Sequence, residues 1–327
     1  MMATLLEVKG FIKRFYERKD VYVKPVLKFI LALVNFLLLN SKIGFMQQLK
    51  SPMIAVILSL ICAFLPLNAM VLLGAAVILA HAYALSLEVC AVTAALLIVM
   101  YLLYFRISAK YAIILIITPI CFMLGVPYAV PMLGGLVFGP GTAVPAGCGA
   151  VVYYLINYMS NNTTSLGTGE VQNGATKVAS MVESLVGNKE MMICVLAMML
   201  TVSVVYFIRR LSVDHSWEIA IGIGTVINIV VHLLGALLPD VKIAVLPLIL
   251  GSIASAVIAF FIKFFVFSVD YSRTERVQFE DDEYYYYVKA VPKNVIATPK
   301  KTVKKIITQK KQPKIIKRID GQNESKE

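Results

Sequence analysis

Apolar runs recur along the chain from residue 26 to residue 268, and short polar or charged segments separate them. A hydrocarbon core about 30 Å thick needs roughly 20 predominantly apolar residues in a helix, and most of these runs approach that length. Backbone N–H and C=O groups have no water partners in lipid, so helices satisfy them within the segment. The pattern therefore predicts an all-α, polytopic transmembrane helix bundle.

Three of the apolar runs are too short to be certain spans. Residues 52–67 and 69–84 meet at the break Leu65-Pro66-Leu67-Asn68, and 131–138 is typical of a thin or re-entrant helix. Two crossings for residues 52–84 and one for 131–138 give about ten spans, and eight is the alternative if both of these weak segments fail to cross. The full set of runs is 26–39, 52–67, 69–84, 87–105, 113–126, 131–138, 146–159, 191–208, 217–238 and 243–267.

Positive charge is concentrated in four segments that flank the runs. They are the N-terminal segment, residues 106–110, Arg209-Arg210 and the tail after Arg273. Cytoplasmic loops carry an excess of Lys and Arg, so we expect all four on the cytoplasmic side. This orientation predicts a multi-pass plasma-membrane protein with both termini cytoplasmic and an extracellular loop at 160–189.

The same pattern divides the chain into three parts. Residues 1–24 form a cytoplasmic amphipathic segment, because residues 4–19 place apolar and charged side chains on opposite helix faces. Residues 25–268 form the transmembrane domain. Residues 269–327 form a cytoplasmic part with an acidic, Tyr-rich element followed by a basic, largely disordered tail.

Proline and glycine crowd residues 110–162, although this stretch is apolar enough for a bilayer. Interrupted helices persist at membrane depth only where protein or water satisfies the freed backbone groups. The stretch is therefore the best candidate for a buried site or a packing hub. Its predicted contributions to a central site are Pro127, Pro131, Gly134, Gly135, Gly139 and Gly141.

Few ionisable or strongly polar side chains fall inside the spans, and such residues point to function by default. His81 lies inside one run, and Asn228 and His232 lie one helical turn apart in another. A spacing of four residues puts Asn228 and His232 on one helix face. They either line a polar cavity or proton path together with His81, or form interhelical hydrogen bonds.

Composition narrows the remaining chemistry. The chain is 59% hydrophobic and 15% charged, with a net charge of +12 that the positive-inside pattern and the basic tail explain without specific nucleic acid. The five cysteines lie in apolar runs without a CxxC pair or a nearby His, so no metal site and no cofactor is expected. No zinc-helix or phosphate-loop motif occurs, and we expect no enzymatic activity.

The tail carries two candidate interaction elements. Residues 278–288 join an acidic run to four adjacent tyrosines that favour an extended strand. Residues 293–318 contain many basic and no acidic side chains, a composition that attracts anionic lipid headgroups or an acidic protein partner. The predicted partner-binding residues, which also allow strand addition to other membrane or cytoplasmic proteins, are Phe279, Tyr284, Tyr286, Lys300 and Lys304.

Two features of the sequence together resemble a known family of proteins. One is the stretch from Phe279 to Lys293, and the other is the proline-broken bundle before it, which contains Pro119-Ile120-Cys121-Phe122. They are similar to a family of uncharacterised polytopic, permease-like membrane proteins of Gram-positive anaerobic bacteria. The resemblance implies a bacterial plasma-membrane location and supplies no catalytic residues. The short inside loops contain no segment of the kind that docks an ATPase.

Two functions follow from these patterns. In the first, the protein is a transport or permease-type component of unknown substrate, and the broken helices build its central site. In the second, it is a membrane scaffold or assembly protein that recruits partners through its cytoplasmic tail. A transporter predicts a solvent-reachable cavity lined by Asn228, His232 or the 134–141 turn, whereas a scaffold predicts a dry, filled bundle.

Overall fold

The computed structural model describes residues 9–12, 15–16, 18–166, 174–239, 241, 244–267, 275–280 and 285–290. Contacts divide the chain into two compact units, Met1–Ser268 and Val269–Glu327, at the position where the composition changes. Tyr284, Lys300, Lys304 and the predicted disordered tail lie outside the described residues. Residues 1–8 also lie outside them, whereas 9–12 and 15–16 are helical as the amphipathic pattern predicts.

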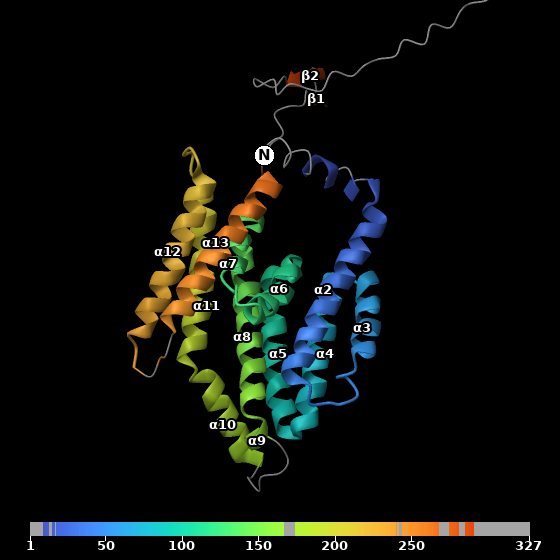
Figure 1. Ribbon diagram of the computed structural model, residues 1–327, viewed down its shortest axis with the longest axis vertical. Coiled ribbons are helices and arrows are strands. Elements are labelled where there is room, and N and C mark those ends of the chain that lie inside the picture. Colours follow the sequence, from blue (N-terminus) through green and yellow to red (C-terminus); the bar gives the residue numbers. More distant parts are fainter. Residues whose placement is uncertain are drawn as a thin grey trace, which may run out of the picture. The chain divides into compact units, whose positions relative to one another are not determined.

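The first unit is built from helices throughout its described residues (Figure 1). They are α2 (Asp20–Ile43), α3 (Pro52–Phe64), α4 (Leu67–Leu85), α5 (Leu87–Ser108), η1 (Ala109–Tyr111), α6 (Ala112–Met123), α7 (Ala129–Leu133), η2 (Gly134–Phe138), η3 (Pro140–Thr142), α8 (Ala143–Asn161), α9 (Thr163–Leu166), α10 (Gly174–Val186), α11 (Lys189–Arg209), α12 (Ser216–Ala236) and α13 (Val245–Phe267).

Among the described residues, 6 helical stretches are long and apolar enough to cross a membrane. They are Asp20–Ile43, Leu67–Leu85, Leu87–Met123, Lys189–Arg209, Ser216–Ala236 and Val245–Val266. The chain is therefore an integral membrane helix bundle, as predicted. Helix length does not confirm ten spans, because Pro52–Phe64 and Ala129–Phe138 are shorter apolar helices.

The longest of these stretches, Leu87–Met123, is not one straight helix. Its backbone leaves helical geometry at Ser108 (φ −144°, ψ 30°) and again at Tyr111 (φ −104°, ψ 32°). Leu97 and Pro119 line one cavity, yet a straight helix would separate them by about 33 Å at 1.5 Å per residue. The chain therefore turns back at η1, and α6 returns across the cavity from α5.

The predicted break after α6 lies inside the bundle. Gly125 has φ 77°, a left-handed conformation that glycine adopts without strain, and α7 then runs directly into η2, a π-helix. Gly139 N donates to Gly134 O at 2.8 Å, which closes the π-helical turn. Val130 and Met132 are buried, so α7 itself is covered by protein.

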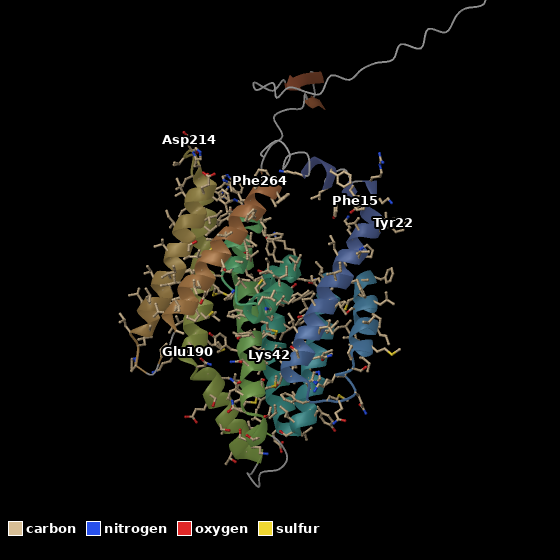
Figure 2. All side chains as sticks on the ribbon, in the orientation of Figure 1. Phe15, Tyr22, Lys42, Glu190, Asp214 and Phe264 are labelled. Atoms are coloured by element: carbon tan, nitrogen blue, oxygen red, sulfur yellow. The ribbon has the colours of Figure 1, made fainter. Side chains whose placement is uncertain are left out.

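Basic side chains gather at one end of the first unit. Near this end Lys9 Nζ donates to Phe264 O (3.4 Å), and Lys28 Nζ donates to Leu65 O (3.0 Å). In Figure 2, Phe15, Tyr22, Asp214 and Phe264 lie toward this end, whereas Lys42 and Glu190 lie toward the other. The basic residues of this end, called the basic end below, are Lys9, Arg18, Lys24, Lys28, Arg106, Lys110, Arg209, Arg210 and Lys263.

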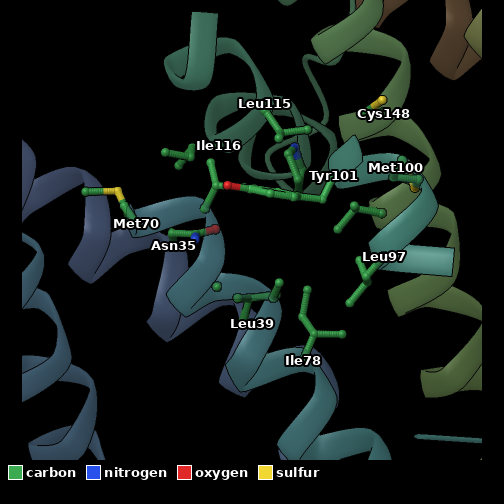
Figure 3. A pocket seen from close by; sticks show the side chains of 15 residues that line it. Asn35, Leu39, Met70, Ile78, Leu97, Met100, Tyr101, Leu115, Ile116 and Cys148 are labelled. Carbon is green, nitrogen blue, oxygen red and sulfur yellow. The ribbon is translucent and has the colours of Figure 1, made fainter. Parts of the chain in front are cut away.

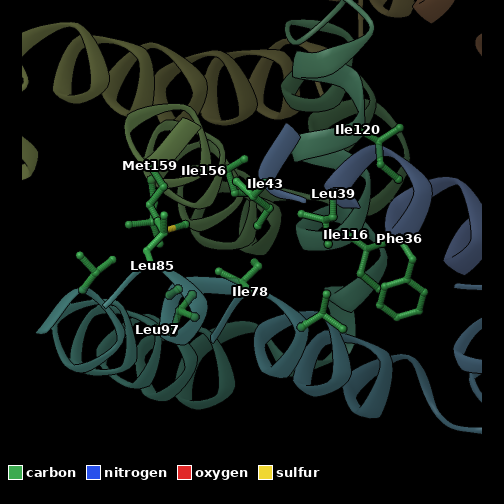
Figure 4. Close-up of a cluster of buried hydrophobic side chains, with 14 of the residues drawn as sticks. Phe36, Leu39, Ile43, Ile78, Leu85, Leu97, Ile116, Ile120, Ile156 and Met159 are labelled. Carbon is green, nitrogen blue, oxygen red and sulfur yellow. The ribbon is translucent and has the colours of Figure 1, made fainter. Parts of the chain in front are cut away.

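Two apolar cores divide the helices into groups. The larger core joins α2, α3, α4, α5, α6, α8, α9 and α10 and contains Phe36, Ile78 and Ile156 (Figure 4). The second core joins α7, η2, α11, α12 and α13, with Met132 and Leu136 at its centre. A small cluster around Met198 connects α6, α8 and α11, and so joins the two groups. The broken segment α6–α7 thus links the two cores.

The second unit contains a β-hairpin in its described residues. Strand β1 (Glu275–Glu280) pairs antiparallel with β2 (Tyr285–Ala290), and Phe279 faces Tyr286 in the register. Strand β2 confirms the extended conformation predicted from the adjacent tyrosines. Strand β1 was not predicted, although its Arg-Val-Gln-Phe-Glu sequence alternates polar and apolar residues over five positions.

Candidate functional site

A cleft of about 410 Å³ lies where α6 ends and α7 begins. Its walls come from α6, the α6–α7 turn, α8, α11, α12 and α13, so it joins both helix groups. We call it the His232 cleft, lined by Phe122, Gly125, Pro127, Tyr128, Tyr153, Tyr154, Glu190, Cys194, His232, Ala244, Pro247 and Leu248.

The sequence explains why a cleft forms at this level. Helix α6 has 12 residues, about 18 Å at 1.5 Å per residue, which is too short to fill the space beside α8 and α11. Gly125 and Pro127 then turn the chain away, because the left-handed glycine ends the helix and the proline lacks an N–H. The space that a full-length helix would occupy is left to the cleft.

Aromatic rings line much of the cleft and pack against one another. The rings of Phe122 and Tyr153 stack with centroids 4.5 Å apart, and Tyr153 meets Tyr154 edge-on at 5.6 Å. On α12, His232 meets Tyr128 edge-on at 5.1 Å. Such contacts each contribute about 0.5–1.5 kcal/mol beyond burial, so they hold the rings in fixed orientations.

His232 is tied to its own helix. Its Nδ1 donates to Asn228 O at 2.8 Å, because a carbonyl oxygen can only accept. Asn228 lies one turn deeper, and its Nδ2 donates to Ser252 Oγ at 3.2 Å. The predicted shared face of Asn228 and His232 is therefore present, and it contains both a cleft residue and an interhelical hydrogen bond.

Buried polar groups without partners continue inward from the cleft. Asn228 Oδ1, Thr201 Oγ1 and Ser255 Oγ are inaccessible and have no hydrogen-bond partner among the described residues. Each such group costs about 1–3 kcal/mol unless water or a ligand satisfies it. With Ser252 they form what we call the polar layer, which receives side chains from α11, α12 and α13.

Helical spacing connects the polar layer to the cleft. On α13, Ser252 and Ser255 follow the cleft residue Leu248 at positions i+4 and i+7, and all three are buried. On α11, Thr201 packs on the same region of α12, since a Cβ on Gly224 would lie 3.7 Å from Thr201 Cγ2. The cleft and the polar layer are therefore successive levels of one helix interface.

The far side of this interface is closed by Arg209 at the basic end. Its guanidinium donates to Leu136 O and to Gly135 O (3.4 Å), carbonyls of the π-helix η2. The same guanidinium lies 5.1 Å from the ring centroid of Trp217. Arg209 therefore fixes η2 against α11 and α12 at the end opposite the cleft.

The predicted central-site residues separate into two places. Pro127 and His232 line the cleft, Asn228 lies directly below it, and Pro131 is buried in α7. The four predicted glycines lie in or after η2 and serve close packing: a Cβ on Gly135 would meet Val202 O at 2.7 Å. The other three are Gly134, Gly139 and Gly141, against Thr142, Tyr206 and Tyr111 respectively.

His81 is not among the residues that line the cleft. Its Nδ1 accepts from Met46 N at 3.2 Å, and its Nε2 donates to Asn40 Oδ1 at 3.0 Å. Asn40 Nδ2 in turn donates to Leu49 O at 2.8 Å. His81 thus anchors the loop between α2 and α3, which is the structural alternative that its sequence position allowed.

The cleft residues that were not singled out from the sequence include Tyr128, Tyr153, Tyr154 and Glu190. The signals available were weak. Adjacent tyrosines inside a predicted span are unusual because tyrosine favours membrane interfaces, and Glu190 opens the span that follows the polar loop. Only the fold shows that these positions meet.

A second cavity lies between α2, α4, α5, α6 and α8 (Figure 3). Its volume is about 80 Å³, and most of its lining is aliphatic, with Asn35 and Met70 facing Leu97 and Met100 across it. Its smaller volume and few polar groups make it a weaker candidate for specific recognition than the His232 cleft.

No group of three His, Cys, Asp or Glu side chains in the described part of the chain is arranged to hold a metal ion. Compared with family models, with curated proteins and with solved structures, the chain matches none. The resemblance to permease-like proteins therefore stays a prediction.

Proposed function

We propose that this protein is a membrane transport component and that the His232 cleft is its substrate site. The observation that supports it is the combination of a cleft of about 410 Å³ between apolar helices with buried polar groups that lack partners directly beneath it. Interrupted helices next to such a site are the arrangement that secondary transporters use to bind substrates. A bundle that served only as an anchor would not need to leave these oxygens without partners.

The orientation of the chain supports this proposal. The cleft reaches Glu190 and Ala244, which lie at the end opposite the basic end. By the positive-inside rule the basic end faces the cytoplasm and the cleft opens outward. We propose ten membrane segments of alternating direction in the plasma membrane, eight full passes plus α6 and α7–η2 as a short re-entrant pair, with both termini cytoplasmic. In this arrangement Arg209, Trp217 and η2 form the inner closure.

The test is whether water-soluble reagents reach the polar layer from both faces. We expect a cysteine in Ser252→Cys to react with a membrane-impermeant methanethiosulfonate from the outside and, in inverted vesicles, also from the inside. The native cysteines are buried or half-buried, and peptide mass mapping separates them from the new one. Val257→Cys, on the exposed face of the same helix, serves as the matched control.

Labelling from both faces would support a translocation path. No labelling from either face would contradict transport through this interface, and labelling from the outer face alone would restrict the cleft to a binding pocket.

The β-hairpin favours a second candidate function, a scaffold that recruits partners. A two-stranded sheet is marginal by itself, and each strand has one edge that the other does not pair. Such an edge accepts a strand from another protein through backbone hydrogen bonds. A dry polar layer in the labelling experiment would favour this function, with anionic lipid or an acidic partner bound by the basic tail.

A further inference from the structure

We infer that the His232 cleft binds a small organic cation, a quaternary ammonium or protonated amine. The inference rests on the proposed function for its place in transport, but binding itself is testable without transport. It is carried by the kinds of side chain that the fold brings together in the cleft.

The lining is rich in π-systems and contains no Lys or Arg. Of the 12 lining residues, Phe122, Tyr128, Tyr153 and Tyr154 are aromatic, and none is Lys or Arg. The ring quadrupole places negative potential over the ring faces, which attracts a cation within about 6 Å of the centroid. A site for a phosphate or carboxylate ligand would instead need Arg or Lys side chains that point into the cleft.

The rings belong to separate helices and surround the cavity. Phe122 comes from α6, Tyr153 and Tyr154 from α8, and Tyr128 from the α6–α7 turn beside His232 of α12. Since neighbouring rings hold one another at 4.5 to 5.6 Å, the walls are already oriented before a ligand enters. Aromatic walls from several elements are the arrangement by which proteins recognise quaternary ammonium groups.

One carboxylate lies at the rim of this aromatic site. Glu190 is in the first turn of α11, where it lines the cleft above Cys194. In a low-dielectric surrounding, a carboxylate near a bound cation adds attraction that water would otherwise screen. The role of Glu190 is thus to favour a positively charged ligand, while the rings provide the contact surface.

Other ligand classes fit less well. A metal cation needs several oxygen or nitrogen ligands, and the described residues contain no such cluster of titratable side chains. A purely apolar ligand fits less well, because the lining includes three tyrosines, a glutamate and a histidine. A volume of about 410 Å³ lies within the range of about 300–1,000 Å³ that small-molecule sites occupy.

The experiment compares two probes of nearly the same shape. Choline and its uncharged carbon analogue 3,3-dimethylbutan-1-ol differ in the charge at one atom. With the purified full-length protein in detergent, we expect choline to raise the thermal midpoint in a concentration-dependent manner and the analogue not to do so. Equal effects of the two probes, or no effect of choline and of phenethylammonium, would overturn the inference.

Variants separate the ring contact from general damage to the fold. Tyr128→Leu removes a π-face and should weaken choline binding by about tenfold or more, whereas Tyr128→Phe should remain within about threefold. Tyr101→Leu makes the same change in the second cavity and should leave choline binding unchanged. Equal losses for Tyr128→Leu and Tyr101→Leu would contradict a ring contact in the cleft.

The failures of the two proposals are distinguishable. If choline does not bind but Ser252→Cys is labelled from both faces, the transport proposal stands and the substrate class is wrong. If choline binds and Ser252→Cys is unreactive, the cleft is a cation site without a path through the membrane.

Discussion

Two glycines in this chain show that the free space around the Cβ position determines whether a glycine is needed for helix packing. Gly135 of η2 faces the backbone of α11, and an added Cβ would lie 2.7 Å from Val202 O and 2.9 Å from Val205 Cβ. Gly222 of α12 has no atom within 4 Å of the same position. The sequence presents both as glycines in apolar helices, but only Gly135 permits a close helix approach, as small residues do in membranes.

Gly135→Ala should therefore destabilise the bundle, by about 1–3 kcal/mol, since two helices must move apart. Gly222→Ala should be neutral or stabilise by about 0.5–1 kcal/mol, because alanine is the better helix former and meets no obstacle. Thermal midpoints of the purified variants in one detergent provide the measurement. Similar midpoints for both variants would show that α11 and η2 are not packed as closely as described.

At the scale of the element, the broken segment depends on contacts from other helices. The π-helix η2 leaves carbonyls at Gly135 and Leu136 that accept from Arg209 of α11. A helix of five residues has too few internal hydrogen bonds to persist alone in any solvent. Its geometry is therefore imposed by α11, which explains why sequence patterns predicted a break here but not a π-helix.

Alanine substitutions of Arg209 and Arg210 offer a matched test of this dependence, because each removes one positive charge and the two positions are adjacent. Arg209→Ala should lower the free energy of unfolding by about 1.5–3 kcal/mol, the contribution of hydrogen bonds to a charged group. Arg210 is exposed and donates to Tyr206 Oη at 2.9 Å, so Arg210→Ala should change stability by less than about 0.5 kcal/mol. Chemical denaturation in mixed micelles measures the difference, and a larger effect of Arg210→Ala would exclude the proposed role.

At the scale of the whole first unit, charge asymmetry between the two ends sets the expected orientation. Residues far apart in sequence, such as Lys28 and Leu65 or Lys263 and Glu218, are joined at the basic end. The predicted alternation of membrane passes requires all the segments at the basic end to lie on the same side of the membrane. Their contacts are compatible with that requirement.

Labelling of intact cells assigns the sides. Asp214→Cys lies on the exposed loop before α12 at the basic end, and Thr164→Cys lies in exposed α9 at the other. We expect an impermeant maleimide to label Thr164→Cys in intact cells, but Asp214→Cys only after permeabilisation, with the wild-type chain as background. The reverse pattern would invert the orientation and place the His232 cleft on the cytoplasmic side.

Several properties of the molecule could be predicted from the sequence because they depend on local pattern. Apolar length requires helices in lipid, the Lys and Arg distribution predicts orientation, and proline with glycine marks the break between α6 and α7. The four-residue spacing of Asn228 and His232 also determines their shared face. These inferences need no knowledge of which helix lies beside which.

The composition of the cleft depends on tertiary structure. Tyr153 on α8, Glu190 on α11 and Leu248 on α13 are distant in sequence, and no local periodicity specifies that they meet. His81 illustrates the converse, since its apolar surroundings in sequence suggest a site, whereas packing assigns it to the loop after α2. Local chemistry determined that the chain enters the membrane in broken helices, and helix packing alone decided which side chains the break brings together, because lipid gives apolar faces little preference among neighbours.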